Sequence, residues 1–392
     1  MLKHIKNVSW FFFSKVFPGL AILLLTRELY ISLDSKAFEN YSVINSLSIT
    51  ISSFLIGWIS QSNLRFYSLD KDSVNSINIV LCTMLMFLAL FFLVLYFFFD
   101  LTYCLVISLS ISVAYNRVSL SYFQARIDSK IVFKQELIRS VFLILFILAN
   151  YLYAFDSLNL TLIILSLSYL LAGSVLYGKV DVKFKFPFYL CKKYIKYGVP
   201  MSLWLVISTA FPTLERLILT SIYKGNLNDY FAMNEFLIRG AGLIFTPVMM
   251  YLHPLLMKEY DNDKLKFDIL VRKTMFIVLL FSCSVIFVYS KLSSFLIPAV
   301  FDGMDEEVIS QSFLILTIPA LWQGCFIAHK KIEALGKTVS LSFFILVSLL
   351  IFIGLALFFV PKYGIWASVY SQAFALVSYI IMVYVFTKRL KF

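Results

Sequence analysis

Charged residues are scarce in this chain: Asp, Glu, Lys and Arg make up 14% of its 392 residues, whereas a soluble globular protein carries about 25%. Hydrophobic residues make up 61% of the chain and aromatic residues 18%. Lys and Arg number 34 against 22 Asp and Glu, so the formal net charge is +12. In a soluble protein this excess suggests nucleic-acid binding. Here the placement of the basic residues indicates a membrane protein, and no nucleic-acid partner is expected.

Cysteine and histidine are also sparse, and they are dispersed. The cysteines are Cys82, Cys104, Cys191, Cys283 and Cys325, and the histidines are His4, His253 and His329. No spacing typical of a zinc site or a disulfide framework occurs, so we expect no bound metal and no cofactor. The phosphate-binding GxxxxGK[ST] motif, the HExxH motif and the nucleophile elbow are missing too. The sequence therefore predicts a protein that is not an enzyme.

Long apolar stretches are what the sequence does contain. Residues 76–99 carry no charge at all, and about 20 apolar residues are enough for a helix to cross a bilayer. We expect twelve transmembrane helices, because helices satisfy their own backbone hydrogen bonds in lipid. Their predicted spans are 8–30, 38–60, 76–99, 101–122, 135–155, 158–178, 196–222, 228–255, 272–290, 308–328, 338–360 and 363–387. The predicted fold class is an all-α integral membrane protein.

Lysine and arginine fall mainly in alternate connections. The face around the connection between the fourth and fifth spans is assigned Arg117, Arg126, Lys130, Lys134 and Arg139. Only Lys36, Lys224, Lys291 and Lys362 fall near the opposite face. Basic loops stay in the cytoplasm, so both termini are predicted to be cytoplasmic.

The predicted spans form two sets of six. We expect an N-terminal lobe over 1–178, a basic cytoplasmic linker over 179–195 and a C-terminal lobe over 196–392. One constant offset places Arg27 on Arg216, Tyr41 on Tyr230 and Asn45 on Asn234. Because six spans is an even number, such repeats run in the same direction, related by a pseudo-twofold axis along the membrane normal. This is a transporter arrangement with the substrate path between the halves.

A few charged residues lie within the predicted spans, where charge is costly and usually marks a pathway. Lys15 lies near Pro18, where the first helix can bend; it either lines a cavity or extends its amine to the interface. Arg239 lies about three turns into the eighth span, and Glu235 precedes it by one turn on the same face. We predict that this pair lines a polar cavity; the alternative is a structural ion pair.

Further polar residues occur near the predicted outer ends. Arg27 with Glu28, and Glu215 with Arg216, either line the cavity or anchor helix ends. Asn45 and Asn234 are predicted to line a polar cavity or to join helices by hydrogen bonds. The candidate substrate-binding cations are thus Lys15, Arg27, Arg216 and Arg239. Glu215 and Glu235 are candidates for binding a coupling proton or sodium ion. Cationic groups in such a cavity suit a phosphate, a pyrophosphate or an acidic sugar.

Four segments carry a resemblance to a known family. They are NVSWFFFSKVFPGLAILLLTREL at the start, GWISQSNLRFY over 57–67, YIKYGVPMSLWLVISTAFPTLERLIL over 194–219 and DYFAMNEFLIRGAGLIFTPVMMYLHPLL over 229–256. With these segments the chain resembles the Wzx-type O-antigen flippases, in the polysaccharide-transporter branch of the MOP flippase superfamily. The resemblance runs over essentially the whole chain and implies two six-helix lobes around a cavity.

The resemblance implies a function as well. Such proteins move undecaprenyl-pyrophosphate-linked oligosaccharide repeat units from the cytoplasmic to the periplasmic leaflet of the bacterial inner membrane by alternating access. It also implies that cationic cavity residues, here Lys15, Arg216, Arg239 and more weakly Arg27, attract the anionic cargo. A polysaccharide polymerase and a chain-length regulator would be partners, besides the lipid bilayer.

Other functions stay open. A cation-coupled multidrug exporter of the same superfamily would have similar topology. A membrane polymerase or glycosyltransferase would need a larger outer loop than this sequence offers, and a scaffold without transport is disfavoured by the charges inside the spans.

Overall fold

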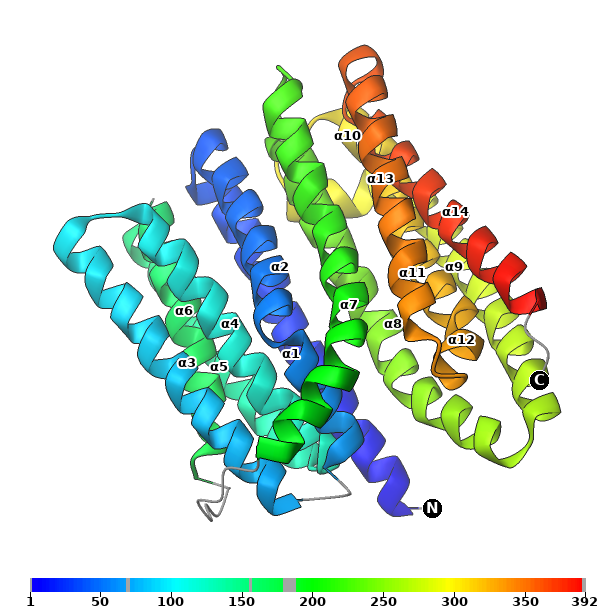
Figure 1. Cartoon of the computed structure of the whole chain (residues 1–392). Helices are drawn as coiled ribbons and strands as arrows, with labels where there is room; N and C mark the ends of the chain where they lie inside the picture. The colour runs from blue at the N-terminus through cyan, green and yellow to red at the C-terminus, as the bar shows by residue number, and fades with distance from the viewer. Residues whose placement is uncertain (1, 68–70, 155–156, 179–187, 390–392) are drawn as a thin grey trace. The chain divides into compact units, whose positions relative to one another are not determined.

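The structure is a computed structural model that describes residues 2–67, 71–154, 157–178 and 188–389. The helices, all shown in Figure 1, are α1 (Leu2–Ser32), α2 (Ser35–Phe66), α3 (Lys71–Phe99), α4 (Thr102–Ala125), α5 (Ser129–Tyr153), α6 (Leu158–Gly173), the short 3-10 helix η1 (Ser174–Leu176), α7 (Phe188–Ile222), α8 (Asn228–Asn262), α9 (Lys264–Val300), α10 (Glu306–Gln311), α11 (Phe313–Ala328), α12 (Lys330–Ala334), α13 (Thr338–Tyr363) and α14 (Trp366–Arg389). The described residues form no strand, so the predicted all-α class is confirmed.

Each predicted span coincides with helix, apart from a few residues at the ends. Several helices run well beyond the predicted span; α9 occupies Lys264–Val300, because a helix continues past the apolar window into its polar flanks. The tenth span is divided at Ser312 into α10 and α11. Among the described helices nine are long and apolar enough to cross a membrane; α1, α5 and α8 fall short of that measure. These three helices carry Lys15, the pair Glu136 and Arg139, and the pair Glu235 and Arg239, respectively.

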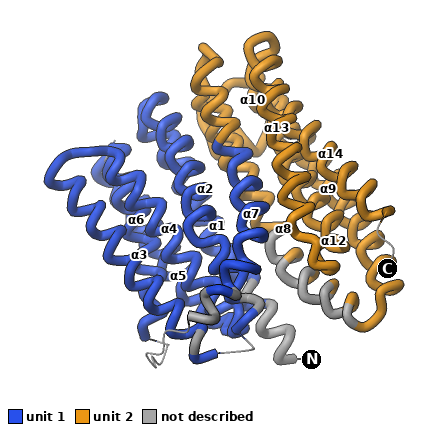
Figure 2. Tube along the Cα trace, in the orientation of Figure 1, with its two compact units in different colours: residues 1–213 blue, residues 214–392 orange. Residues whose placement is uncertain are grey.

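Contacts divide the chain into two compact units, Met1–Thr213 and Leu214–Phe392, coloured separately in Figure 2. The boundary falls inside α7, so most of this helix belongs to unit 1 and its last turns belong to unit 2. The lobe boundary expected from the sequence lies earlier, in the basic segment 179–195, of which residues 179–187 lie outside the described part of the chain.

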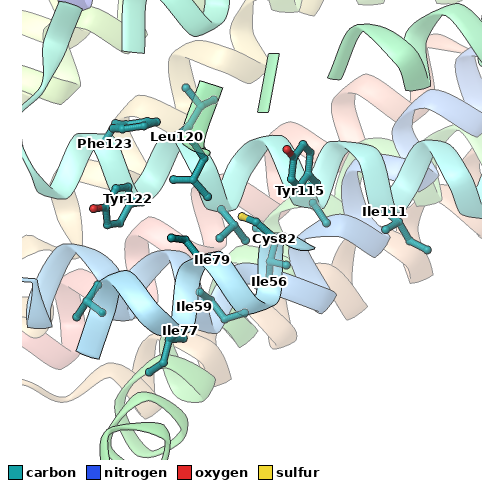
Figure 3. Close-up of a cluster of buried hydrophobic side chains, with 14 of the residues drawn as sticks. Ile56, Ile59, Ile77, Ile79, Cys82, Ile111, Tyr115, Leu120, Tyr122 and Phe123 are labelled. Carbon is teal, nitrogen blue, oxygen red and sulfur yellow. The ribbon is translucent and has the colours of Figure 1, made fainter. Parts of the chain in front are cut away.

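In unit 1, α4 is the central helix and packs against α2, α3, α5 and α6, while α1 packs against α5. The buried residues of α4 form a core with α2 and α3. Figure 3 shows part of this core, where Ile56 and Ile59 of α2 and Cys82 of α3 meet Tyr115 of α4. α4 is almost wholly buried, and it is unusually rich in serine for such a position. Ser108, Ser110 and Ser121 donate hydrogen bonds to backbone carbonyls, Ser108 to that of Ala89 at 3.0 Å.

Two helices of unit 1, α2 and α7, come very close together. A Cβ atom built at Gly198 would lie 2.2 Å from the Trp58 carbonyl oxygen, so only glycine fits there. Further along, Thr50 donates a hydrogen bond to the Thr209 carbonyl at 2.7 Å. This carbonyl lies next to the one that loses its helical donor to Pro212, since proline has no N–H group. Small and hydroxyl-bearing residues thus hold α7 against α2, as is typical of helix pairs in membranes.

In unit 2, α11 packs against α8, α9 and α14, and α13 packs against α14. Outward faces of both units are apolar: Phe87 and Phe91 on α3, Phe276 and Phe287 on α9, and Phe358 on α13 are exposed. In water, apolar faces of this size would promote aggregation, whereas lipid accommodates them.

Candidate functional site

A cluster of charged side chains lies inside unit 1, and we call Lys15, Arg117, Glu136 and Arg139 the basic cluster. Lys15 of α1 lies 4.0 Å from Glu136 of α5. Arg139, one turn further along α5, pairs with the same carboxylate at 3.2 Å. Glu136 is 2% exposed and Arg139 9%. Counted along α5 from Ser129, the Arg139 Cα lies about 15 Å from the helix start, well inside the bundle.

Arg117 of α4 completes the basic cluster without a carboxylate of its own. Its guanidinium donates to the hydroxyls of Ser52 and Ser53 on α2, at 3.0 and 2.7 Å. It lies within electrostatic range of Arg139, which in turn stacks over the Tyr169 ring at 5.0 Å. Three helices, α1, α4 and α5, therefore bring together three cations and one carboxylate, which is the charge excess that an anion needs.

The charge pattern places Arg117 and Arg139 near the cytoplasmic face together with the loop cations, and it gives no sign that they face the bundle. Both lie within helices, at least partly buried. The sequence signal was the spacing of Glu136 and Arg139, which places both side chains on one face of α5, as Glu235 and Arg239 are on α8. Of the basic cluster, only Lys15 is predicted as a site residue from the sequence; Arg117, Glu136 and Arg139 are not.

A second charged group, the unit 2 network, joins α7, α8 and α14. Arg216 donates to Glu235 at 2.8 Å, and Arg239 donates to the other oxygen of Glu235 at 2.6 Å. Arg216 also lies 3.4 Å from the Asn234 side-chain oxygen and over the Phe231 ring. Arg216, Glu235 and Asn234 are buried, while the Arg239 side chain is 22% exposed. Two arginines thus share one carboxylate, each paired with a different oxygen of Glu235.

Glu215 belongs to the same network but is held differently. It accepts hydrogen bonds from the Tyr230 hydroxyl at 2.5 Å and the Ser368 hydroxyl at 3.3 Å. The Asn234 amide donates to the Tyr230 hydroxyl at 3.5 Å and so connects it to Arg216, which lies next to the Asn234 oxygen. Glu215 is 2% exposed. A buried carboxyl held by hydroxyls binds a proton or a cation more readily than one fixed between two guanidiniums. The network therefore contains one carboxylate fixed between two arginines and one carboxyl group held by hydroxyl groups.

The sequence-predicted residues thus divide into two groups. The structure joins Arg216, Arg239, Glu215, Glu235 and Asn234 in the unit 2 network, and Lys15 lies in the basic cluster. Arg27 is exposed on α1, and Asn45 on α2 is buried with no hydrogen-bond partner for its amide nitrogen. Their roles in binding stay predictions.

The offset between the halves explains why Arg27 and Arg216 differ. The position corresponding to Glu235 is Ser46, and the position corresponding to Arg239 is Thr50. Arg216 is buried because a carboxylate faces it; Arg27 has no acidic residue at the equivalent place. Elsewhere in the described part of the chain, no three His, Cys, Asp or Glu side chains gather in a way suited to a metal ion.

Comparisons with known proteins support the fold. Neither protein-family models nor curated protein sequences give a match. Among solved structures, the chain is similar to the lipid II flippase MurJ in an inward closed conformation, with a TM-score of 0.71, 14% identity and coverage of 99% of this chain and 88% of that one. It is also similar to the Vibrio cholerae MATE transporter VcmN, with a TM-score of 0.68, 14% identity and coverage of 98% and 97%.

An inward-facing multidrug resistance transporter of the MATE family and the MOP superfamily gives a TM-score of 0.66 at 12% identity, covering 98% of this chain and 93% of that one. At these identities the likeness concerns the fold. Together with the apolar helices, it makes the chain a multi-pass membrane protein with the fold of the MOP-superfamily transporters.

Proposed function

We propose that this protein is a flippase for a lipid-linked anionic glycan. Its substrate would be an oligosaccharide joined through pyrophosphate to a polyprenyl lipid such as undecaprenol, a precursor of O-antigen or another surface polysaccharide. It would act in the bacterial cytoplasmic membrane, with both termini in the cytoplasm, and would move the precursor to the periplasmic leaflet by alternating access. A polymerase and a chain-length regulator would act on the product afterwards.

The basic cluster is the observation that carries this proposal. Lys15, Arg117 and Arg139 surround one carboxylate, that of Glu136, inside a unit whose outer faces are apolar. Guanidinium and ammonium groups are the usual protein ligands of phosphate oxygens. The name of the similar MurJ structure, a lipid II flippase, agrees with a lipid-linked substrate.

The physical problem for such a protein is to carry a glycan and two phosphates past hydrocarbon while the polyprenyl chain stays in lipid. Fixed cationic donors replace part of the hydration that the phosphates lose, and so lower the barrier. No covalent bond needs to form or break. A proton or sodium ion would supply direction, and Glu215 is the better of the two acidic candidates because Glu235 is already neutralised by Arg216 and Arg239.

The test uses the bacterium that carries the gene. Deletion should stop export of surface polysaccharide and leave its lipid-linked precursor in the cytoplasmic leaflet. The double variant Arg117→Gln/Arg139→Gln should reach the membrane at the normal level without restoring export. The matched control is Lys130→Gln/Lys134→Gln, which removes the same charge from exposed positions of α5 and should restore it. Normal export in the deletion strain would refute the proposal.

A second candidate function is cation-coupled drug export. The buried Glu215 carboxyl and the likeness to MATE transporters favour it. Under this alternative the deletion strain would become sensitive to lipophilic cations such as ethidium, and Glu215→Gln would not restore resistance. Surface polysaccharide would stay normal. The two functions therefore predict opposite phenotypes in the same strain.

A further inference from the structure

The position of Glu136 is unusual for a site that has to receive an anion. Its carboxylate lies between Lys15 and Arg139, the two cations on α1 and α5, with 3% of its side chain exposed. A carboxylate there repels a phosphate. If anion affinity were the only requirement, an uncharged residue would serve the site better.

The basic cluster is also incompletely satisfied. The Arg139 Nε atom is buried and has no hydrogen-bond partner, and the Oε2 atom of Glu136, although ion-paired with Arg139, forms no hydrogen bond. Because buried donors are rarely left unpaired in native structures, an unpaired guanidinium N–H indicates a ligand that approaches Arg139. This donor and the charge excess are independent observations, and both point to an anion.

The charges can be counted directly. Three cations and one carboxylate leave two positive charges in excess. A pyrophosphate diester, with a lipid on one phosphate and a sugar on the other, carries two negative charges because each phosphate keeps one ionised oxygen. A monophosphate diester carries one. The excess of two positive charges in the basic cluster therefore matches the pyrophosphate and exceeds the monophosphate.

We infer that Glu136 is the residue that sets the charge of the substrate accepted by the basic cluster. By cancelling one of the three cations it adjusts the site to a pyrophosphate diester, and it keeps the affinity for that group low enough for release. Arg139 Nε donates to a phosphate oxygen of the bound substrate. This inference rests on the proposed function, which already includes the pyrophosphate linkage, and adds to it the role of the Glu136 carboxylate in selecting that linkage.

The experiment measures binding to the purified full chain in neutral detergent. The probes are farnesyl-diphosphoryl-N-acetylglucosamine, with two negative charges, and farnesyl-phosphoryl-mannose, with one. The wild-type chain should prefer the first. Glu136→Gln should lower the Kd of the diphosphate probe about tenfold and that of the monophosphate probe about threefold, because the added positive charge acts on two negative charges in one probe and on one in the other. Binding to this variant should also weaken more steeply with salt.

Two controls separate charge from structure. Glu136→Asp keeps the charge and should bind both probes as the wild-type chain does. Glu39→Gln removes a carboxylate of unit 1 that pairs with Lys36 at 2.9 Å, away from the basic cluster, and should change neither Kd. Equal or weaker binding of the diphosphate probe by Glu136→Gln would overturn the inference while leaving the flippase proposal standing. If the wild-type chain bound neither probe, the proposed function itself would fall.

Discussion

A buried guanidinium depends on the residue that faces it. Arg216 is 3% exposed because Glu235 accepts its hydrogen bond at 2.8 Å, whereas Arg27, at the corresponding place in the first half, has serine at the position of Glu235 and lies exposed. Removing one partner of a buried ion pair lowers the free energy of unfolding more than removing one partner of an exposed pair, because the remaining buried charge is no longer hydrated.

Arg216→Met should therefore destabilise the protein by about 1–3 kcal/mol, because one oxygen of Glu235 loses its donor inside unit 2. Arg239→Met should lower the stability of the protein by a smaller amount, because 22% of that side chain is exposed. Thermal unfolding in detergent measures both. Adding Glu235→Gln to Arg216→Met should recover part of the loss. If the double variant proved less stable than Arg216→Met alone, the pair would not be coupled as the structure indicates.

The sequence predicted most residues of the two charged groups and missed Arg117, Glu136 and Arg139 for a physical reason. Arg239 and Glu235 stand deep in an apolar stretch, so their burial could be predicted. Arg117 and Arg139 lie near the ends of the predicted spans 101–122 and 135–155, where sequence alone does not distinguish a loop cation from one that faces the bundle. Whether these arginines are buried depends on their partners, which are Ser52 and Ser53 on α2 for Arg117 and Glu136 on α5 for Arg139. Local hydropathy does not show how the helices pack, so it does not predict these contacts.

At the scale of the secondary-structure elements, the close contact with α2 is what attaches α7 to unit 1. At Gly198 the nearest atom to an added Cβ is a backbone oxygen, that of Trp58, at 2.2 Å. A backbone atom cannot rotate away as a side chain can, so the helices must separate. The apolar pattern predicted both helices but gave no sign that they touch at this glycine.

Gly198→Ala should destabilise the protein by about 1–3 kcal/mol, the usual cost of overpacking. Gly354→Ala is the matched control: Gly354 lies in α13, and an added Cβ there meets nothing within 4 Å. That change should be neutral or stabilising by about 0.5–1 kcal/mol, because alanine favours helix over glycine. Equal effects of the two changes on the unfolding temperature would contradict the close approach of α2 and α7.

At the scale of the whole molecule, the buried charged groups of the two units differ in net charge. The basic cluster in unit 1 has an excess of two positive charges, while the two arginines of the unit 2 network are balanced by Glu215 and Glu235. The sequence predicted the two-lobe plan but distributed the cations over both lobes. We interpret the difference as a separation of tasks, with anion binding in unit 1 and ion coupling in unit 2.

This separation predicts that binding and transport can be uncoupled by one substitution. Glu215→Gln keeps an acceptor for the hydroxyls of Tyr230 and Ser368 but cannot exchange a proton. The variant should bind farnesyl-diphosphoryl-N-acetylglucosamine with the wild-type Kd, because the basic cluster is untouched. In proteoliposomes, its movement of the same probe should no longer respond to an imposed proton gradient. A Kd raised in step with lost transport would instead place Glu215 in the binding site, and an undiminished response to the gradient would remove it from coupling.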